Sequence, residues 1–166
     1  MKIQKKTFAG LWFALGVVLT LGLVLLHLQV PLIKSNLVGI STALIVGTST
    51  GMMCGRRWGL TILNLEKHKR WKAIGLGILI GILVLYAIVM AMLIFSYSET
   101  EFLKLLHEKA YWSIPISILK LPGLALFGTV MGCILEPLVI LMSGLGGGAL
   151  YLLRHKIPPL LNRFSK

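Results

Sequence analysis

The sequence predicts an all-α integral membrane protein, a four-span helical bundle that forms one membrane domain over residues 1–166. Hydrophobic residues make up 57% of the chain and charged residues only 13%, whereas soluble proteins are about 45–50% apolar and about a quarter charged. Four long uncharged runs are each long enough for the roughly 20 residues of a membrane-spanning helix. These runs cover residues 7–33, 35–55, 73–98 and 121–153, the last interrupted only by Glu136.

The first two spans are predicted at about residues 8–28 and 36–55. The first follows a basic start but exceeds the 7–15 apolar residues of a secretory signal and lacks a small-residue cleavage site, so an uncleaved span is expected. Pro31 favours a tight turn before the chain returns.

Small residues recur every four positions in the second span. They are Gly39, Ala43, Gly47, Gly51 and Gly55, and shorter versions occur later as Gly77 with Gly81 and Gly128 with Gly132. Such GxxxG-type spacing allows two helix backbones to approach closely. The pattern predicts helix packing, either inside the bundle or against a partner chain.

The third span is predicted at about residues 73–95 and leads to an outer loop. Within that loop, residues 100–112 carry apolar side chains on one helical face and charged side chains on the other. This pattern is typical of a short amphipathic helix, which we expect to lie along the outer interface.

The fourth span, at about residues 121–153, is predicted to be kinked or broken. Its 33 residues would extend about 50 Å as a helix, against about 30 Å of hydrocarbon, and Pro122 and Pro137 interrupt it. Either one tilted helix crosses, or residues 121–135 form a separate piece. Residues 144–149 match G-x-G-x-x-A, but no strand precedes them, so close packing or local unwinding is expected instead of nucleotide binding.

The net charge is +12, and the basic residues are distributed as membrane topology requires. Thirteen of seventeen basic residues fall before the first span, between the second and third, or after the last. This positive-inside pattern places both termini and the central loop in the cytoplasm, next to anionic lipid head groups. We therefore expect a multi-pass protein of a plasma membrane, taken to be the bacterial inner membrane, and no nucleic-acid partner.

Four residues are candidates for an intramembrane function: Glu136, His27, Thr48 and Thr50. A charged side chain at mid-bilayer costs about 3 kcal/mol, so Glu136 is expected to face the bundle in either a structural or a functional role. The chain has no aspartate, and its histidines and cysteines lack metal-ligand spacings. No catalytic residue, cofactor or metal site is expected.

Two functional hypotheses follow. The first is a non-catalytic accessory subunit, which docks on a larger membrane protein or on itself. The alternative is a small oligomeric transporter or channel with Glu136 on a proton or cation path. A lipid-modifying enzyme is a weaker third reading, because the sequence offers few carboxylates for acid–base chemistry.

Overall fold

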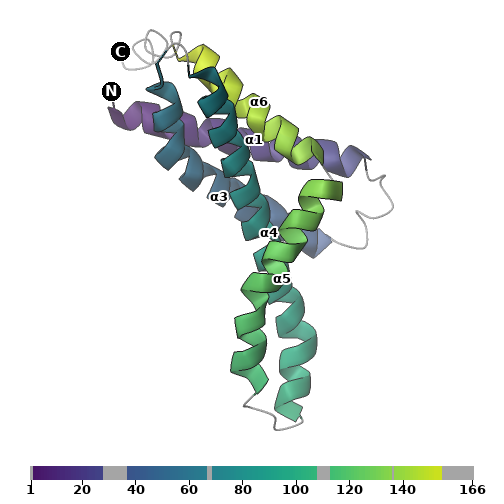
Figure 1. Cartoon of the computed structure of the whole chain (residues 1–166). Helices are drawn as coiled ribbons and strands as arrows, with labels where there is room; N and C mark the ends of the chain where they lie inside the picture. The colour runs from purple at the N-terminus through teal and green to yellow at the C-terminus, as the bar shows by residue number, and fades with distance from the viewer. Residues whose placement is uncertain (1, 28–36, 67–68, 108–112, 136, 155–166) are drawn as a thin grey trace.

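A computed structural model of the chain describes residues 2–27, 37–66, 69–107, 113–135 and 137–154, and confirms an all-helical protein (Figure 1). Within these residues there are five helices and no strand. The helices are α1 (Lys2–His27), α3 (Leu37–Leu63), α4 (Arg70–His107), α5 (Ser113–Leu135) and α6 (Pro137–Leu153).

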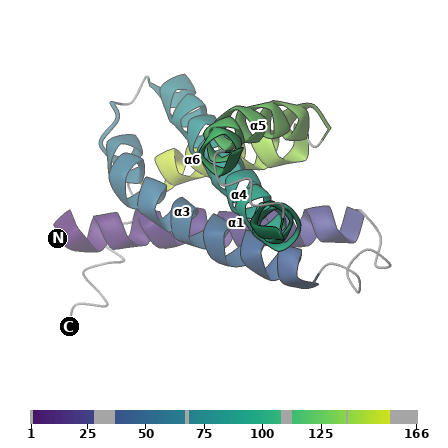
Figure 2. The same ribbon diagram turned by 90° about the horizontal axis from the view of Figure 1, so that it is seen from below.

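The helices form a bundle with one projecting arm. α1, α3, α6 and the first half of α4 pack together, while the second half of α4 continues out of the bundle beside α5 (Figures 1 and 2). We call this pair of helical segments the α4–α5 arm. α1 packs mainly on α3, and α4 packs mainly on α6.

Two helices of the described residues are long and apolar enough to cross a membrane. These segments are Lys5–Val24 of α1 and Arg70–Ile94 of α4. α5 and α6 provide a third span if they are counted as one broken span. Lys120–Ile134 and Pro137–Leu153 pass the test for a span together, but they differ in direction by 84°. These helices are consistent with a membrane protein. The predicted four-span count and kinked fourth span are not confirmed, since α3 is not among the candidate spans.

Several predicted boundaries need correction. Within the amphipathic helix expected over residues 100–112, residues 100–107 are not a separate element, because they form the end of α4; residues 108–112 lie outside the described part of the chain. No glycine or proline follows Gly81 within α4, so nothing in the sequence breaks it. α3 likewise continues beyond residue 55 to Leu63. Residues 121–135 belong to a separate helix that begins at Ser113 and contains Pro122.

The contact between α1 and α3 depends on missing side chains. A methyl group at Gly55 would lie 2.7 Å from the backbone oxygen of Ala9, and one at Gly51 would lie 2.9 Å from Val17 Cγ2. One at Gly59 would lie 2.6 Å from Ala9 Cβ. The backbone of α3 therefore lies directly on α1 along one face, where dispersion contacts accumulate.

α4 and α6 meet in a second seam of the same kind. A methyl group at Gly77 would lie 3.0 Å from the Cα of Gly147, and it would also clash with the backbone oxygen of Ser143. A methyl group at Gly147 would clash with the backbone oxygen of Ala73. α6 remains helical through its glycine cluster, so Gly147 serves backbone contact without unwinding the helix.

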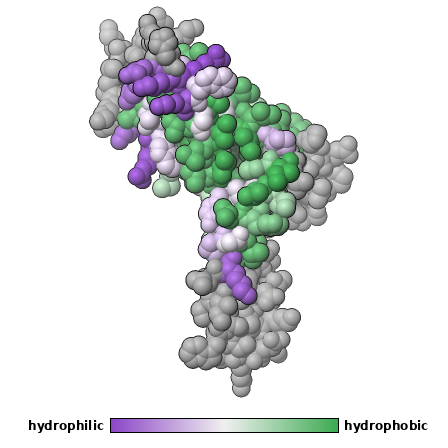
Figure 3. Space-filling view, viewed as in Figure 1, coloured by the Kyte–Doolittle hydropathy of each residue, from purple (hydrophilic) through white to green (hydrophobic). Residues whose placement is uncertain are grey.

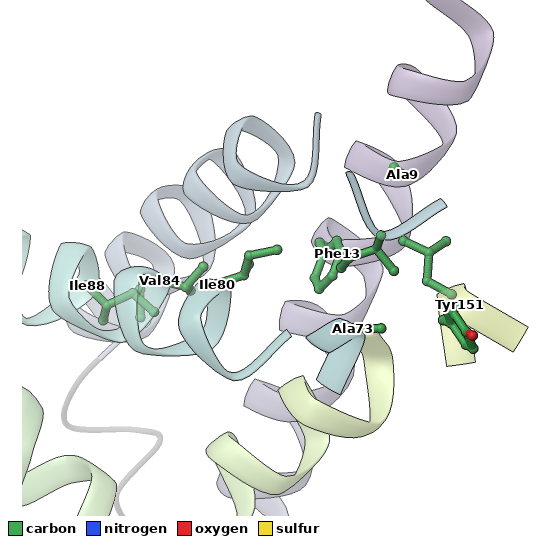
Figure 4. Close-up of a cluster of buried hydrophobic side chains, with 10 residues drawn as sticks. Ala9, Phe13, Ala73, Ile80, Val84, Ile88 and Tyr151 are labelled. Atoms are coloured by element: carbon green, nitrogen blue, oxygen red, sulfur yellow. The ribbon is translucent and has the colours of Figure 1, made fainter. Parts of the chain in front are cut away.

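Larger side chains fill the space beside the two seams. Ile80, Val84 and Ile88 lie along one face of α4 and are buried, as is Phe13 of α1 (Figure 4). Leu150 of α6 belongs to the same cluster. The core thus joins three helices around α4, and the close seams hold these side chains in contact.

The α4–α6 seam can be tested with two glycines of α4 that lie two positions apart. Gly77→Ala should destabilise the protein by about 1–3 kcal/mol, because the added methyl group meets backbone atoms that cannot turn aside. Gly75→Ala should be neutral or stabilising by up to about 1 kcal/mol, because nothing lies within 4 Å of its added carbon. Thermal unfolding in detergent would measure both. Equal melting temperatures would contradict the seam.

Candidate functional site

The structure does not bring the four candidate residues together in the part of the chain that it describes. Glu136 lies outside the described residues, so its predicted orientation stays a prediction. His27 is the last residue of α1, and the structure does not describe its side chain. Thr48 and Thr50 are both half-buried on α3.

The hydroxyl groups in the helices bond to their own backbone. Thr48 Oγ1 donates to the carbonyl oxygen of Leu44 at 2.6 Å. Thr20, Thr129 and Ser143 each donate in the same way to the carbonyl oxygen four residues earlier, at 2.7–2.8 Å. A hydroxyl engaged in this way has already used its proton, so it offers its surroundings an acceptor but no donor.

A cavity of about 290 Å³ lies between α1, α4 and α6, and we call it the apolar slot. Its walls are almost wholly apolar. They include Trp12, Gly16 and Thr20 of α1, Val84 of α4, and Ser143 and Gly146 of α6. Because the two hydroxyls bond within their helices, the walls offer few unused polar groups. The slot therefore suits an apolar group.

A hydrogen bond between distant parts of the chain fixes one end of the slot. Trp12 Nε1 donates to the carbonyl oxygen of Gly146 at 3.0 Å and so links α1 to α6. Phe8 stacks on Trp12 with ring centroids 6.2 Å apart. The indole N–H rarely stays unpaired when it is buried, and here its partner is a backbone carbonyl on the opposite wall.

Two glycines create the space inside the slot. An added Cβ at Gly16 or at Gly146 would meet no heavy atom within 4 Å, unlike those at the seam glycines. Gly16 belongs to α1 and Gly146 to α6, so both walls are open at these positions. The slot is therefore a volume that larger side chains would fill without disturbing the neighbouring helices.

Basic residues gather where α1 begins, α3 ends, α4 begins and α6 ends, and we call this region the basic end. Hydrophilic residues are concentrated there in the space-filling view, in contrast to the apolar middle of the bundle (Figure 3). The described cations of the basic end are Lys5, Lys6, Arg56, Arg57, Lys69, Arg70, Lys72 and Arg154. Positive charge therefore dominates this region.

Polar contacts hold the basic end together. Tyr151 Oη donates to the backbone oxygen of Glu66 at 2.9 Å, and the Arg154 guanidinium lies 3.9 Å from the centre of the Tyr151 ring. The Glu66 carboxylate pairs with Lys69 Nζ at 2.8 Å, in place of the Arg70 pairing that i, i+4 spacing suggests. The hydrogen bond and the charge of Lys69 lower the pKa of Glu66 below its ordinary value.

The described residues contain no group of side chains that could hold a metal ion. No three side chains of His, Cys, Asp and Glu gather in this part of the chain, and Cys54 and Cys133 are both free thiols. Comparison with known protein families, with curated proteins and with solved structures finds no match to this chain.

Sequence reasoning did not identify the apolar slot or the Tyr151 contact. Phe8, Trp12 and Gly16 recur every four residues and so share one face of α1. On that face two aromatic side chains are followed by a position without a side chain, which indicates a gap. The partner of Trp12 could not be deduced, since Gly146 is 134 residues away and contributes only a backbone oxygen.

Trp12→Phe tests the hydrogen bond that links the two walls of the slot. The change keeps an aromatic ring but removes the N–H donor, so we expect a loss of about 0.5–1.5 kcal/mol in unfolding free energy. Trp71→Phe is the control, since Trp71 is 82% exposed and should tolerate the change. Unfolding in mixed detergent micelles would give both values. If the two variants behave alike, the Trp12 bond contributes nothing to stability.

Proposed function

We propose that this chain is a small, non-catalytic, multi-pass membrane protein that serves as an accessory subunit of a larger membrane complex. In this proposal the basic end lies at the cytoplasmic face of a bacterial inner membrane, next to anionic lipid head groups. The partner is another membrane protein or a second copy of the chain.

The apolar surface of the α4–α5 arm carries the proposal. Leu121, Ala125 and Thr129 of α5 are buried, and Gly128 and Gly132 approach Val89 and Leu85 of α4. The remaining faces of α5 expose large apolar side chains. These are Leu124, Leu126, Phe127, Val130, Met131 and Ile134. α5 is apolar on all sides but is covered on only one of them. Its uncovered faces therefore suit contact with lipid or with a partner.

The small-residue faces do not add a second partner surface. Gly47, Gly51 and Gly55 of α3 face side chains or backbone of α1 and α4, and Gly77 and Gly81 of α4 face α6. These faces are already occupied within the chain. The outer surface of α5, by contrast, is uncovered and presents apolar side chains to an additional helix.

The transport alternative gains no support from the described residues. Thr48 bonds to its own helix, and Glu136 and the His27 side chain lie outside the described part of the chain. We retain the accessory role because it rests on exposed side chains that the structure describes.

The proposed orientation predicts which loops are accessible from outside the cell. A cysteine introduced at Ser98 should react with a membrane-impermeant maleimide in intact cells, and one introduced at Ser165 should react only after the cells are opened. A background that carries Cys54→Ala and Cys133→Ala removes the native thiols. Labelling of Ser165→Cys but not Ser98→Cys in intact cells would show that the orientation is the reverse of the proposed one.

Site-specific photo-cross-linking tests the partner surface with a matched pair of positions. Phe127 is 61% exposed and Ala125 is 0% exposed, although both belong to α5. A benzophenone side chain at Phe127 should cross-link a membrane protein or a second copy of the chain in native membranes, whereas one at Ala125 should yield internal cross-links. Exclusive cross-linking of Phe127 to lipid would refute an accessory role for this face.

A further inference from the structure

We propose that the apolar slot binds one acyl chain of an anionic phospholipid whose phosphate lies against Lys5 at the basic end. This inference rests on the proposed membrane location but not on the accessory role. It assigns to the slot a specific occupant from the membrane itself, which the protein would carry as a bound lipid.

The chemistry of the slot selects a hydrocarbon chain. Thr20 and Ser143 donate their hydroxyl protons to their own helices, and the Trp12 N–H is used by Gly146, so these groups have no donor left for an occupant. The volume of about 290 Å³ is just below the range for small-molecule sites, about 300–1,000 Å³. A helix from another protein would be too wide for the slot, because a helix is about 10–12 Å across with its side chains. A single flexible hydrocarbon chain fits better.

The slot has an opening through which a lipid chain can enter sideways. Leu15 and Leu19 of α1 and Leu145 of α6 line the slot and are also exposed. They therefore border its mouth on the outer surface of the bundle. Within the membrane this mouth faces lipid, so an acyl chain reaches the slot without crossing a polar barrier.

The spacing along α1 places a charged head group at the correct distance from the slot. Lys5, Phe8, Trp12 and Gly16 follow one another at intervals of three, four and four, so they share one helical face. Lys5 and Gly16 are separated by about 16 Å along the helix axis. Half the hydrocarbon core is about 15 Å, which is the distance from the head-group level to the chain end.

The charge of the basic end selects an anionic head group. Eight described cations gather there, and Glu66, the acidic residue described among them, is already paired with Lys69. A lysine ammonium binds phosphate as a compact point charge. A zwitterionic head group brings a cation of its own into this region, whereas an anionic one adds only negative charge.

Fluorescence quenching by brominated lipid tests the proposal directly. Trp58→Phe, Trp71→Phe and Trp112→Phe leave Trp12, which lines the slot, as the sole tryptophan. The purified chain is reconstituted in phosphatidylcholine vesicles that contain a small fraction of phosphatidylglycerol with brominated acyl chains. We expect quenching above the value that random contact gives, and about fivefold weaker preference for the anionic lipid after Lys5→Gln.

Variants of three open glycines provide the controls. Gly16→Leu and Gly146→Leu fill the slot from its two walls and should abolish the excess quenching. Gly22→Leu adds the same side chain to open space on α1 outside the slot and should leave the quenching unchanged. Melting temperatures near that of the parent protein verify that each variant is folded. Because there are two slot variants, the test can still be made if one of them does not fold.

Two results would overturn the proposal. Quenching that follows the mole fraction of brominated lipid, or that persists in both slot variants, would show that no acyl chain occupies the slot. Equal quenching by brominated phosphatidylcholine would remove the head-group selection. The vesicles contain no other protein, so these results are independent of the cross-linking that tests the accessory role.

Discussion

Backbone contact between α4 and α6 determines how the rest of the molecule is arranged. Helices in lipid gain little from hydrophobic burial against one another, so their association depends on close packing. Gly77 and Gly147 provide it by bringing two backbones together without side chains between them. This contact fixes the rotation of α6, which in turn directs Gly146 toward α1, where Trp12 reaches its carbonyl oxygen. The core beside Ile80 and the apolar slot both follow from that one rotation.

The sequence predicted the helical class because composition and uncharged runs are properties of the whole chain. It located the small-residue positions for a different reason, since a spacing of four can be read locally along one helix. It did not predict that α4 would continue to His107, because the third span was expected to end at about residue 95, before an outer loop. A change from apolar to charged residues marks the edge of the hydrocarbon, but it does not by itself end a helix.

The candidate site was less predictable than the fold. Glu136 drew attention because an isolated charge in an apolar run is conspicuous, but cavities arise from residues that lack side chains. Gly16 and Gly146 look like the seam glycines in the sequence, and only their neighbours distinguish them. Gly77 faces backbone, while Gly16 faces open space. This difference depends on the packing of segments more than a hundred residues apart, which no local pattern contains.

The continuity of α4 has a mechanical consequence. Its 38 residues form a rod about 57 Å long, and the segment after Gly81 contains neither glycine nor proline to act as a hinge. The bundle grips one half of this rod, and α5 accompanies the other. The segment beyond Gly81 is about 39 Å long, so a tilt of about 10° in the bundle would displace its far end by about 7 Å. α4 is therefore a stiff connection between the bundle and the arm.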